Sequence, residues 1–512
     1  MIPKKRFNCN QRGKFIGALS SVNKYLKAIS TNLIIFAISS VFFLLITPIA
    51  IRVMGSEFYG LWAILYAIIQ LAGVGTAGMS SIVNKFASES QANSEENLGE
   101  IIAGGVTIVF FLAILTALVL FAIQNLIVTN LKISSLTFQA QFKNAILIIT
   151  FSLIPKFISR VYQGFLFSQI KYNLAKQIDL YYQIGLWTGI VLISLWQKNL
   201  IYISMWCFVI SFLSLIAYVI AVKRTCVYQF SFNRSVIRSM LRFSGYLFIE
   251  SSAVTLFQQM DTVLVGMVLG PSIAGIYSVG TSVSVRLSSI TGQITEVMIP
   301  YASLKDSLKD HQKLYSTFRR LSHYVSLVVS LTGAAAIIWM NELLTVWISA
   351  DYASKNSNFY RILIIAYCFL SLARPAHQTL TGMGKVKFTS IVYSIATLFM
   401  LSSVYFLSQK IGLLGAVLSD CIMIFLLIYN IYVYHLLDSK KPWIEFFYDI
   451  GIGFFSPIIL YAIILIVPGL SIKLALTVLY LVFCVYILLK DSWLRAEFKH
   501  LSQSGKKKED LS

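Results

Sequence analysis

Eight charged side chains stand inside stretches of this sequence that are otherwise apolar, and they are the residues with which the chain could do chemistry. Four are basic and four are acidic: Lys156, Arg160, Arg286, Arg374, Glu250, Asp261, Glu296 and Asp420. A charge at membrane depth costs at least about 2.5–3.5 kcal/mol on insertion scales, so it is expected to line a cavity or to pair inside a helix bundle. Bases in such places can bind an anion, and carboxylates can bind a proton or a metal ion.

The basic residues come with polar neighbours at helical spacing. The expected helix face after Pro155 carries Lys156, Arg160 and Gln163. Two like charges four residues apart, with no acid in their own span, predict an anion between them. Arg286 shares a face with Ser282 and Gln293, and Arg374 stands with His377 and Gln378 around Pro375 in the segment ARPAHQ. The sequence therefore predicts Lys156, Arg160, Arg286 and Arg374 as anion-binding residues, with Gln163, Gln258, Gln293 and His377 as polar cavity lining.

The acidic residues Glu250 and Asp261 are eleven positions apart, which returns to within about 20° of one helix face. They are candidates for binding a coupling H⁺ or Na⁺. A structural alternative stays open for Asp261. It lies about 13 Å from the turn at Gly270, and Arg286 about 16 Å from Gly275, so the two could form a salt bridge across neighbouring spans. Glu296 lies near the end of its span and could reach water.

Aromatic and amide side chains cluster in the fifth predicted span, at Tyr181, Tyr182, Gln183 and Trp187. They could stack on sugars, although ordinary helix packing is the more common role of such residues.

The elements that position these side chains are membrane helices. The chain has 512 residues, of which 57% are hydrophobic and only 12% are charged, and its mean hydropathy is +0.76. Runs of about twenty apolar residues are long enough to cross a hydrocarbon core of about 30 Å. The sequence predicts an all-α integral membrane protein with about fourteen transmembrane helices, at 31–52, 58–83, 101–123, 144–167, 178–197, 200–222, 244–269, 275–300, 321–347, 360–381, 387–408, 411–436, 449–468 and 471–490.

The distribution of basic residues predicts the orientation of these spans. An even number of spans places both termini on one side. Thirty of the 42 Lys and Arg residues fall on that side, and eight fall on the other. The positive-inside rule makes that side cytoplasmic. The formal net charge of +21 does not indicate nucleic acid, because the basic residues flank apolar runs instead of gathering on one soluble module.

Two cytoplasmic segments space their basic residues by four. They are Arg234, Arg238 and Arg242 in NRSVIRSMLRF, and Lys305, Lys309 and Lys313 in SLKDSLKDHQKLY. Both patterns fit short helices lying on anionic lipids. A solvated charged helix explains them equally well.

The segment DTVLVGMVLGPSIAGIY (Asp261–Tyr277) resembles the aspartate–helix–glycine–turn–glycine–tyrosine pattern of bacterial polysaccharide repeat-unit (O-antigen) flippases, the Wzx family. That family belongs to a superfamily with the MATE exporters and lipid II flippases. VMGSEFYGLWAIL (Val53–Leu65) is similar to the family's turn between its first two helices. The two turns also resemble each other, since Gly55 and Tyr59-Gly60 echo Gly270 and Gly275-Ile276-Tyr277. GVGTAGM, in the second span, departs from the family's aspartate–leucine–glycine segment.

The resemblance implies two six-helix lobes related by a pseudo-twofold repeat, with two further C-terminal helices. The domains it implies are a basic cytoplasmic N-terminal tail at 1–30, lobes at 31–222 and 244–436, a cytoplasmic linker or interfacial helix at 223–243, helices thirteen and fourteen within 437–490, and a basic cytoplasmic tail at 491–512.

The resemblance also implies a function. It is the translocation of undecaprenyl-pyrophosphate-linked glycan across the bacterial plasma (inner) membrane by alternating access around a cationic cavity. The basic candidates would bind the pyrophosphate. Glu250 and Asp261 would bind the coupling ion, and no other cofactor is expected. Anionic membrane lipids and other polysaccharide-assembly proteins are the further candidate partners.

Two alternatives stay open. A cation-coupled multidrug exporter would favour acids and aromatics in its spans, whereas this chain places as many bases as acids there. A membrane glycosyltransferase or polymerase, the enzyme alternative, commonly needs metal-binding carboxylates. The longest outside loop, at about 124–143, has no Asp or Glu, and the sequence contains neither a D-x-D motif nor a phosphate-binding G-x-x-x-x-G-K-[ST] loop. The sequence therefore predicts a transporter and not an enzyme, with no catalytic or metal-binding residues.

Overall fold

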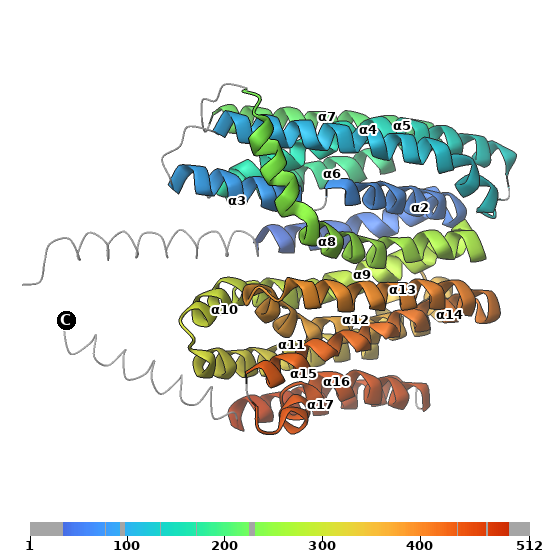
Figure 1. Cartoon of the computed structure of the whole chain (residues 1–512). Helices are drawn as coiled ribbons and strands as arrows, with labels where there is room; N and C mark the ends of the chain where they lie inside the picture. Colours follow the sequence, from blue (N-terminus) through green and yellow to red (C-terminus); the bar gives the residue numbers. More distant parts are fainter. Residues whose placement is uncertain are drawn as a thin grey trace, which may run out of the picture. The chain divides into compact units, whose positions relative to one another are not determined.

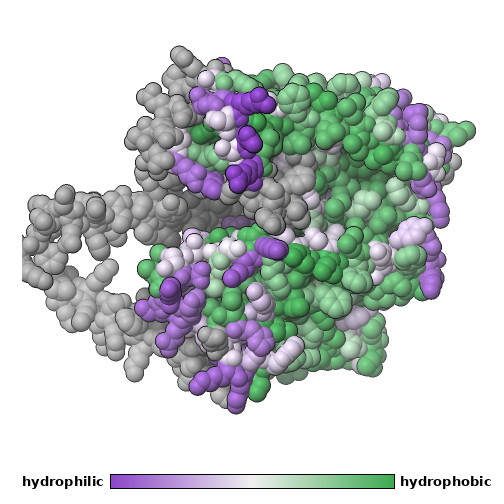
Figure 2. All heavy atoms as spheres, viewed as in Figure 1, coloured by the Kyte–Doolittle hydropathy of each residue, from purple (hydrophilic) through white to green (hydrophobic). Residues whose placement is uncertain are grey.

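The fold is known from a computed structural model, which describes residues 34–76, 78–92, 98–133, 135–169, 171–224, 231–437, 439–466 and 469–490. Within these ranges the chain is helical and forms no strand (Figure 1). Eleven of the described helices are long and apolar enough to cross a membrane, and Ser56–Ala72 and Leu470–Cys484 are shorter apolar helices. Hydrophobic residues cover the middle of the helices, and hydrophilic residues gather towards their ends (Figure 2). This confirms the predicted all-α, multi-pass membrane protein. The tails at 1–30 and 491–512 lie outside the described residues.

The contacts within the chain divide it into two compact units. Unit 1 comprises Met1–Gly55, Ala72–Thr129 and Ser134–Phe248, and unit 2 comprises Ser56–Leu71, Asn130–Ile133 and Ile249–Ser512. This division follows contacts and not the internal repeat, so the lobes at 31–222 and 244–436 stay a prediction.

Unit 1 is built around helix α5, which packs against α7 and α3. Its helices are Ile34–Met54, α3 (Met79–Ala92), α4 (Leu98–Asn130), α5 (Leu136–Ser168), α6 (Tyr172–Trp196), α7 (Leu200–Lys223) and the first turns of α8 (Arg234–Leu269). A short 3-10 helix, η1 (Gly73–Thr76), precedes α3. Residues 234–243, predicted as a short interfacial helix, are continuous with the seventh span in α8.

Unit 2 is built around α12, the most enclosed of the candidate spans, which packs against α11 and α9. Its helices are α2 (Ser56–Ala72), the rest of α8, α9 (Pro271–Thr295), α10 (Met298–Ser307), α11 (His311–Trp347), α12 (Ala350–Gly382), α13 (Val386–Ile411), α14 (Leu413–Asp420), the 3-10 helix η2 (Cys421–Leu427), α15 (Ile428–Leu436), α16 (Pro442–Ile466) and α17 (Leu470–Lys490).

Three predicted spans are not continuous α-helices. In the span predicted at 275–300, α9 ends at Thr295 and α10 begins at Met298 after two turn residues. The span predicted at 58–83 breaks into α2, η1 and α3. Three glycines lie in the break, each costing a helix about 1 kcal/mol, and Gly78 adopts a φ of +82°. The span predicted at 411–436 tightens into the 3-10 helix η2 directly after Asp420. No glycine or proline lies in η2, so its tightening begins at a buried carboxylate and not at a helix-breaking residue.

The lysine segment 305–313 also differs from the single short helix that its spacing predicts. α10 ends at Ser307, Lys309 has a φ of +54°, and α11 begins at His311. Asp310 caps α11 by accepting a hydrogen bond from the backbone N–H of Lys313 at 3.4 Å. A cap that satisfies a free N–H favours a new helix start at this point.

The two turns that resemble each other in sequence share a backbone feature. Gly55 precedes α2 with a φ of +80°, and Gly270 precedes α9 with a φ of +94°. Such values favour glycine. The glycines that follow lie against each other in unit 2, where a Cβ on Gly275 would lie 3.1 Å from the Cα of Gly60. α2 and α9 therefore cross at two residues without side chains, a contact typical of close helix packing in membranes.

Ion pairs attach helices α16 and α17 to α11. The Arg319 guanidinium donates to both oxygens of Asp449, at 2.8 and 3.1 Å, and Tyr434 donates to the same carboxylate at 2.7 Å. Near the other end of α11, Lys473 Nζ lies 2.6 Å from Glu342. These buried and half-buried pairs give the last two helices defined partners within unit 2.

Candidate functional site

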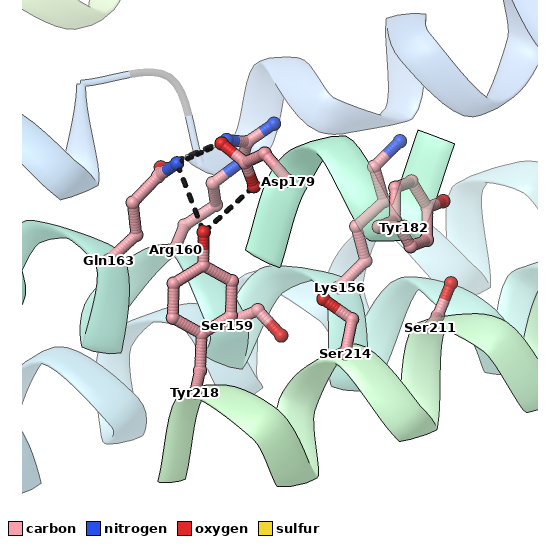
Figure 3. A pocket seen from close by; sticks show the side chains of 9 residues that line it. All are labelled: Lys156, Ser159, Arg160, Gln163, Asp179, Tyr182, Ser211, Ser214 and Tyr218. Carbon is pink, nitrogen blue, oxygen red and sulfur yellow. Dashed lines mark hydrogen bonds between the residues drawn. The ribbon is translucent and has the colours of Figure 1, made fainter. Parts of the chain in front are cut away.

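A polar cavity lies inside unit 1, between α5, α6 and α7 (Figure 3). Its lining is basic, acidic and hydroxyl-rich, and consists of Lys156, Ser159, Arg160, Gln163, Asp179, Tyr182, Ser211, Ser214 and Tyr218. The cavity volume is about 30 Å³. A cavity needs a volume of about 10–15 Å³ to hold one water molecule. In this structure the cavity is therefore large enough for water or part of a polar group, but not for a sugar.

One hydrogen-bond network links the three helices around this cavity. Arg160 Nη1 of α5 donates to Gln163 Oε1 at 2.9 Å, and Gln163 Nε2 donates to Asp179 Oδ2 of α6 at 2.6 Å. Tyr218 of α7 donates to Asp179 Oδ1 at 2.8 Å. Figure 3 shows the carboxylate held between the amide and the phenol. Gln163 therefore connects the guanidinium to the carboxylate.

The charges of the cavity favour an anion. Lys156 and Arg160 carry two formal positive charges and Asp179 one formal negative charge, which is a formal excess of one positive charge. Arg160 is exposed and has five N–H donors, of which the network above uses one. The N–H donors that the network does not use can bind a phosphate or carboxylate group through two parallel hydrogen bonds.

Local packing explains why these side chains meet. Pro155 lies inside α5 and has no N–H to donate to the preceding turn. Eight residues further on, Gln163 is followed by Gly164, where a Cβ would collide with the backbone carbonyl of Ser80 on α3. Only glycine lets α5 approach α3 this closely, and the approach fixes the helix turn that carries Gln163.

The structure brings together only two of the four predicted basic residues. Arg286 and Arg374 belong to unit 2. Arg286 is half-buried and lies within electrostatic reach of the Tyr66 hydroxyl. Arg374 packs over Gly292, where a Cβ would lie 2.7 Å from Nη1, and its Nε is buried without a hydrogen bond among the described residues. Their anion-binding role stays a prediction.

The predicted polar lining divides in the same way. Gln163 lines the unit 1 cavity, whereas Gln258 and Gln293 are half-buried in unit 2. His377 packs against an aromatic ring, its centroid 5.6 Å from that of Tyr429. Of the aromatic and amide cluster at 181–187, only Tyr182 lines the cavity.

The predicted ion-binding residue Asp261 lies in a second polar cluster, inside unit 2. The Tyr277 hydroxyl lies 2.8 Å from Asp261 Oδ2 and 2.8 Å from Asp420 Oδ2. Asp261 Oδ1 accepts the backbone N–H of Thr262 at 2.5 Å. The prediction for Glu250 concerns a side chain that lies outside the described residues.

The salt bridge considered between Asp261 and Arg286 does not form in this structure. Both residues are described, and the partners of Asp261 are Thr262 and Tyr277. The residue count predicts similar depths for the two residues, but depth alone does not determine which helix faces meet.

Three residues of these clusters were not predicted from the sequence as site residues. Asp179 lies one residue inside the predicted fifth span, where a charge is easily taken for the end of a span. Asp420 was visible in the sequence as an acid inside a span, but its hydrogen-bond partner, Tyr277, is 143 residues away in the sequence. Tyr277 belongs to the glycine–tyrosine motif quoted above, and that motif is the feature of the sequence that could have indicated its role.

The arrangement of these helices defines a class of protein. The chain is similar in structure to lipid II flippase MurJ in an inward closed conformation, with a TM-score of 0.66 and 16% identity, over 89% of this chain and 99% of that one. It is also similar to an inward-facing multidrug resistance MATE transporter of the MOP superfamily, with a TM-score of 0.64 and 10% identity, over 81% of this chain and 99% of that one. The protein therefore has the multi-pass helical fold shared by MATE transporters and MurJ.

Sequence comparison identifies the family within this class. The chain belongs to the polysaccharide biosynthesis protein family, whose model matches residues 49–355. It is 23% identical to a putative O-antigen transporter of Shigella flexneri over 184 residues, which are 36% of this chain and 43% of that relative. The match thus spans less than half of the relative's length. The predicted resemblance to polysaccharide flippases is confirmed, and the relatives are transporters and flippases, not enzymes.

Proposed function

We propose that this protein flips undecaprenyl-pyrophosphate-linked oligosaccharide repeat units across the bacterial plasma membrane by alternating access, driven by an ion gradient. The family and the fold support a membrane flippase. The observation that carries the substrate class is the unit 1 cavity, where two bases and one acid line a space inside a membrane-spanning bundle.

A pyrophosphate crossing the membrane needs positive charge, because two unit charges attract far more strongly at low dielectric than in water. Lys156 and Arg160 supply this charge from one face of α5. Arg286 and Arg374 are the second pair of bases in the proposal, and they would bind an anionic group within unit 2. The cavity is too small for a sugar in this conformation, so the glycan itself would enter only when the transporter opens.

The proposal includes the orientation given by the basic residues. Both termini face the cytoplasm, where the lipid-linked glycan is assembled, and the exposed arginines of α8 face the anionic inner leaflet.

The test uses a bacterial strain that lacks its own repeat-unit flippase and carries this protein together with the matching glycan genes. Arg160→Ala should insert normally and reduce surface glycan display strongly. The matched control is Lys198→Ala, which removes one positive charge from an exposed loop residue of unit 1 and should leave display unchanged. Wild-type display from Arg160→Ala at equal protein level would rule out the cationic cavity as the substrate site.

The main alternative of the same fold is a cation-coupled drug exporter. Such a protein would protect cells against cationic dyes and would not restore glycan display in the same strain. Dye resistance that is retained in Arg160→Ala would favour the exporter, since a positively charged guanidinium does not attract a cationic substrate.

A further inference from the structure

Three side chains from three helices meet in the interior of unit 2. They are Asp261 of α8, Tyr277 of α9 and Asp420, the last residue of α14. Their exposed fractions are 1%, 0% and 0%, so no bulk water reaches them. The Tyr277 hydroxyl lies 2.8 Å from one oxygen of each carboxylate.

The number of hydrogens in this cluster limits its charge. A tyrosine hydroxyl has one hydrogen and can donate to only one carboxylate. The other contact at 2.8 Å would place lone pairs against lone pairs, unless the second carboxyl group carries a hydrogen of its own. The geometry therefore requires one proton in addition to the hydrogen of the phenol, so that one of the two carboxyl groups is protonated.

The hydrogen bonds also indicate which carboxyl group carries that proton. Asp261 accepts at both oxygens, from Thr262 N–H and from Tyr277, as an ionised carboxylate does. Asp420 Oδ1 is buried without any hydrogen-bond partner, a costly situation for a charged oxygen. The consistent arrangement is a chain in which Asp420 donates to the Tyr277 oxygen and Tyr277 donates to Asp261.

The surroundings offer no other compensation for two negative charges. Tyr367 of α12 is in electrostatic contact with both carboxyl groups, Tyr393 of α13 lies next to Tyr367, and Cys421 adjoins Asp420. No Lys or Arg forms an ion pair with either carboxyl group in the part of the chain that the structure describes. Two carboxylates that share a buried site cannot both ionise easily, so they hold a proton between them.

We propose that Asp261, Tyr277 and Asp420 form a proton-binding site in which the two carboxyl groups share one proton through the tyrosine hydroxyl. The site binds H⁺ in preference to Na⁺, because the Tyr277 hydrogen bonds occupy the facing oxygen of each carboxyl group. Asp420 stands where α14 passes into the 3-10 helix η2, and a 3-10 stretch within a helix often marks a hinge. The proton thus binds and leaves at the residue where this span changes from an α-helix to a 3-10 helix. As a step of transport this inference rests on the proposed function, whereas as a binding site it does not.

The binding site is tested on the purified full-length protein by infrared spectroscopy, through the carbonyl band of a carboxylic acid and its shift in D₂O. The wild type should show this band at neutral pH. It should be lost in Asp420→Asn and shifted in Tyr277→Phe, which removes only the bridging hydroxyl. The control Asp306→Asn, in α10, should retain it. A wild type without the band, or a band unchanged in Asp420→Asn and Tyr277→Phe, would overturn the proposal, as would saturable ²²Na⁺ binding that Asp420→Asn abolishes.

The transport step is tested separately in proteoliposomes with undecaprenyl-pyrophosphate-linked glycan. A pH gradient should accelerate flipping by the wild type but not by Asp420→Asn, and a Na⁺ gradient should have no effect. If the band is present and the wild type moves no glycan, the proposed function fails and the proton site stands. If the wild type moves glycan and only a Na⁺ gradient drives it, the transport role of the proton site fails and the flippase stands.

Discussion

The polar clusters of the two units differ in charge and in access. In unit 1, two bases and one acid line a cavity that Arg160 connects to an exposed surface. In unit 2, two carboxyl groups and a tyrosine are completely buried, and none of the described Lys or Arg residues is paired with them. A site that leaves guanidinium donors available suits an anionic ligand of some size, whereas a site closed around a single hydrogen has room for a proton. Under the two proposals above, substrate binding and proton binding use different side chains of this chain.

The largest effect should come from reversing the charge in unit 1. Arg160→Glu replaces the donor to Gln163 by a carboxylate that repels an anion in the cavity, and two like charges about 4 Å apart near a protein surface repel by about 4 kcal/mol. Glycan flipping in proteoliposomes should fall by about 100-fold or more, since each 1.4 kcal/mol is about tenfold. The carboxylic-acid band of unit 2 should be unchanged. If Arg160→Glu also removed that band, the two clusters would not be independent sites.

A second effect concerns the glycines that support each cluster. Gly164 follows Gln163 and lies against the Ser80 carbonyl, whereas Gly275 precedes Tyr277 by two residues and lies against the Cα of Gly60. A methyl group at residue 164 would collide with backbone. At residue 275 its nearest neighbour would lie 3.1 Å away. Gly164→Ala should therefore destabilise the protein by about 1–3 kcal/mol, the usual cost of overpacking, and Gly275→Ala by less. Thermal unfolding of the purified variants, followed by tryptophan fluorescence, measures the difference, and an equal or reversed order would show that the α5–α3 contact yields easily.

The single acid of the unit 1 cavity should have a smaller effect of opposite sign. Asp179→Asn removes the negative charge near Arg160 and keeps an oxygen that accepts from Gln163 or Tyr218. The cavity then holds an anion more tightly, by about 1 kcal/mol or about fivefold, the interaction of two unit charges about 4 Å apart in water. The concentration of lipid-linked glycan at half-maximal flipping should fall, and high salt should reduce the gain. A weaker affinity would mean that Asp179 positions the bases instead of opposing the anion.

Most of the fold could be predicted from the sequence, because apolar runs of sufficient length have few alternatives to membrane helices. The breaks in the spans were harder to predict. The glycines at 73–78 were visible, whereas η2 contains nothing that marks it as 3-10. The pair Lys156 and Arg160 met Gln163 as predicted, since all three lie on one helix face and short-range geometry determines it. Asp179 and Asp420 were not assigned to their clusters, because their partners lie on other helices and only tertiary packing brings them together.

The smallest effect should distinguish the basic segments of the two units. Arg234, Arg238 and Arg242 are exposed on α8. In unit 2, Lys305 and Lys313 lie 3.0 and 3.6 Å from the Asp310 carboxylate. The hydrogen bond from Lys305 lowers the pKa of Asp310. Asp310 therefore stays ionised as the pH falls through the ordinary range of a carboxyl group, and it releases the lysines only at a pH below its lowered pKa.

Arg238→Ala should accordingly weaken binding of the purified protein to vesicles that contain phosphatidylglycerol, by about 1 kcal/mol. Lys313→Ala should change it less at neutral pH, because part of that charge is already neutralised by Asp310. In the background Asp310→Asn both lysines are released, and Lys313→Ala should then cost about as much as Arg238→Ala. Equal effects of Arg238→Ala and Lys313→Ala in the unmodified protein would show that Asp310 does not withhold these lysines from the lipid, and that the two basic segments meet the membrane in the same way.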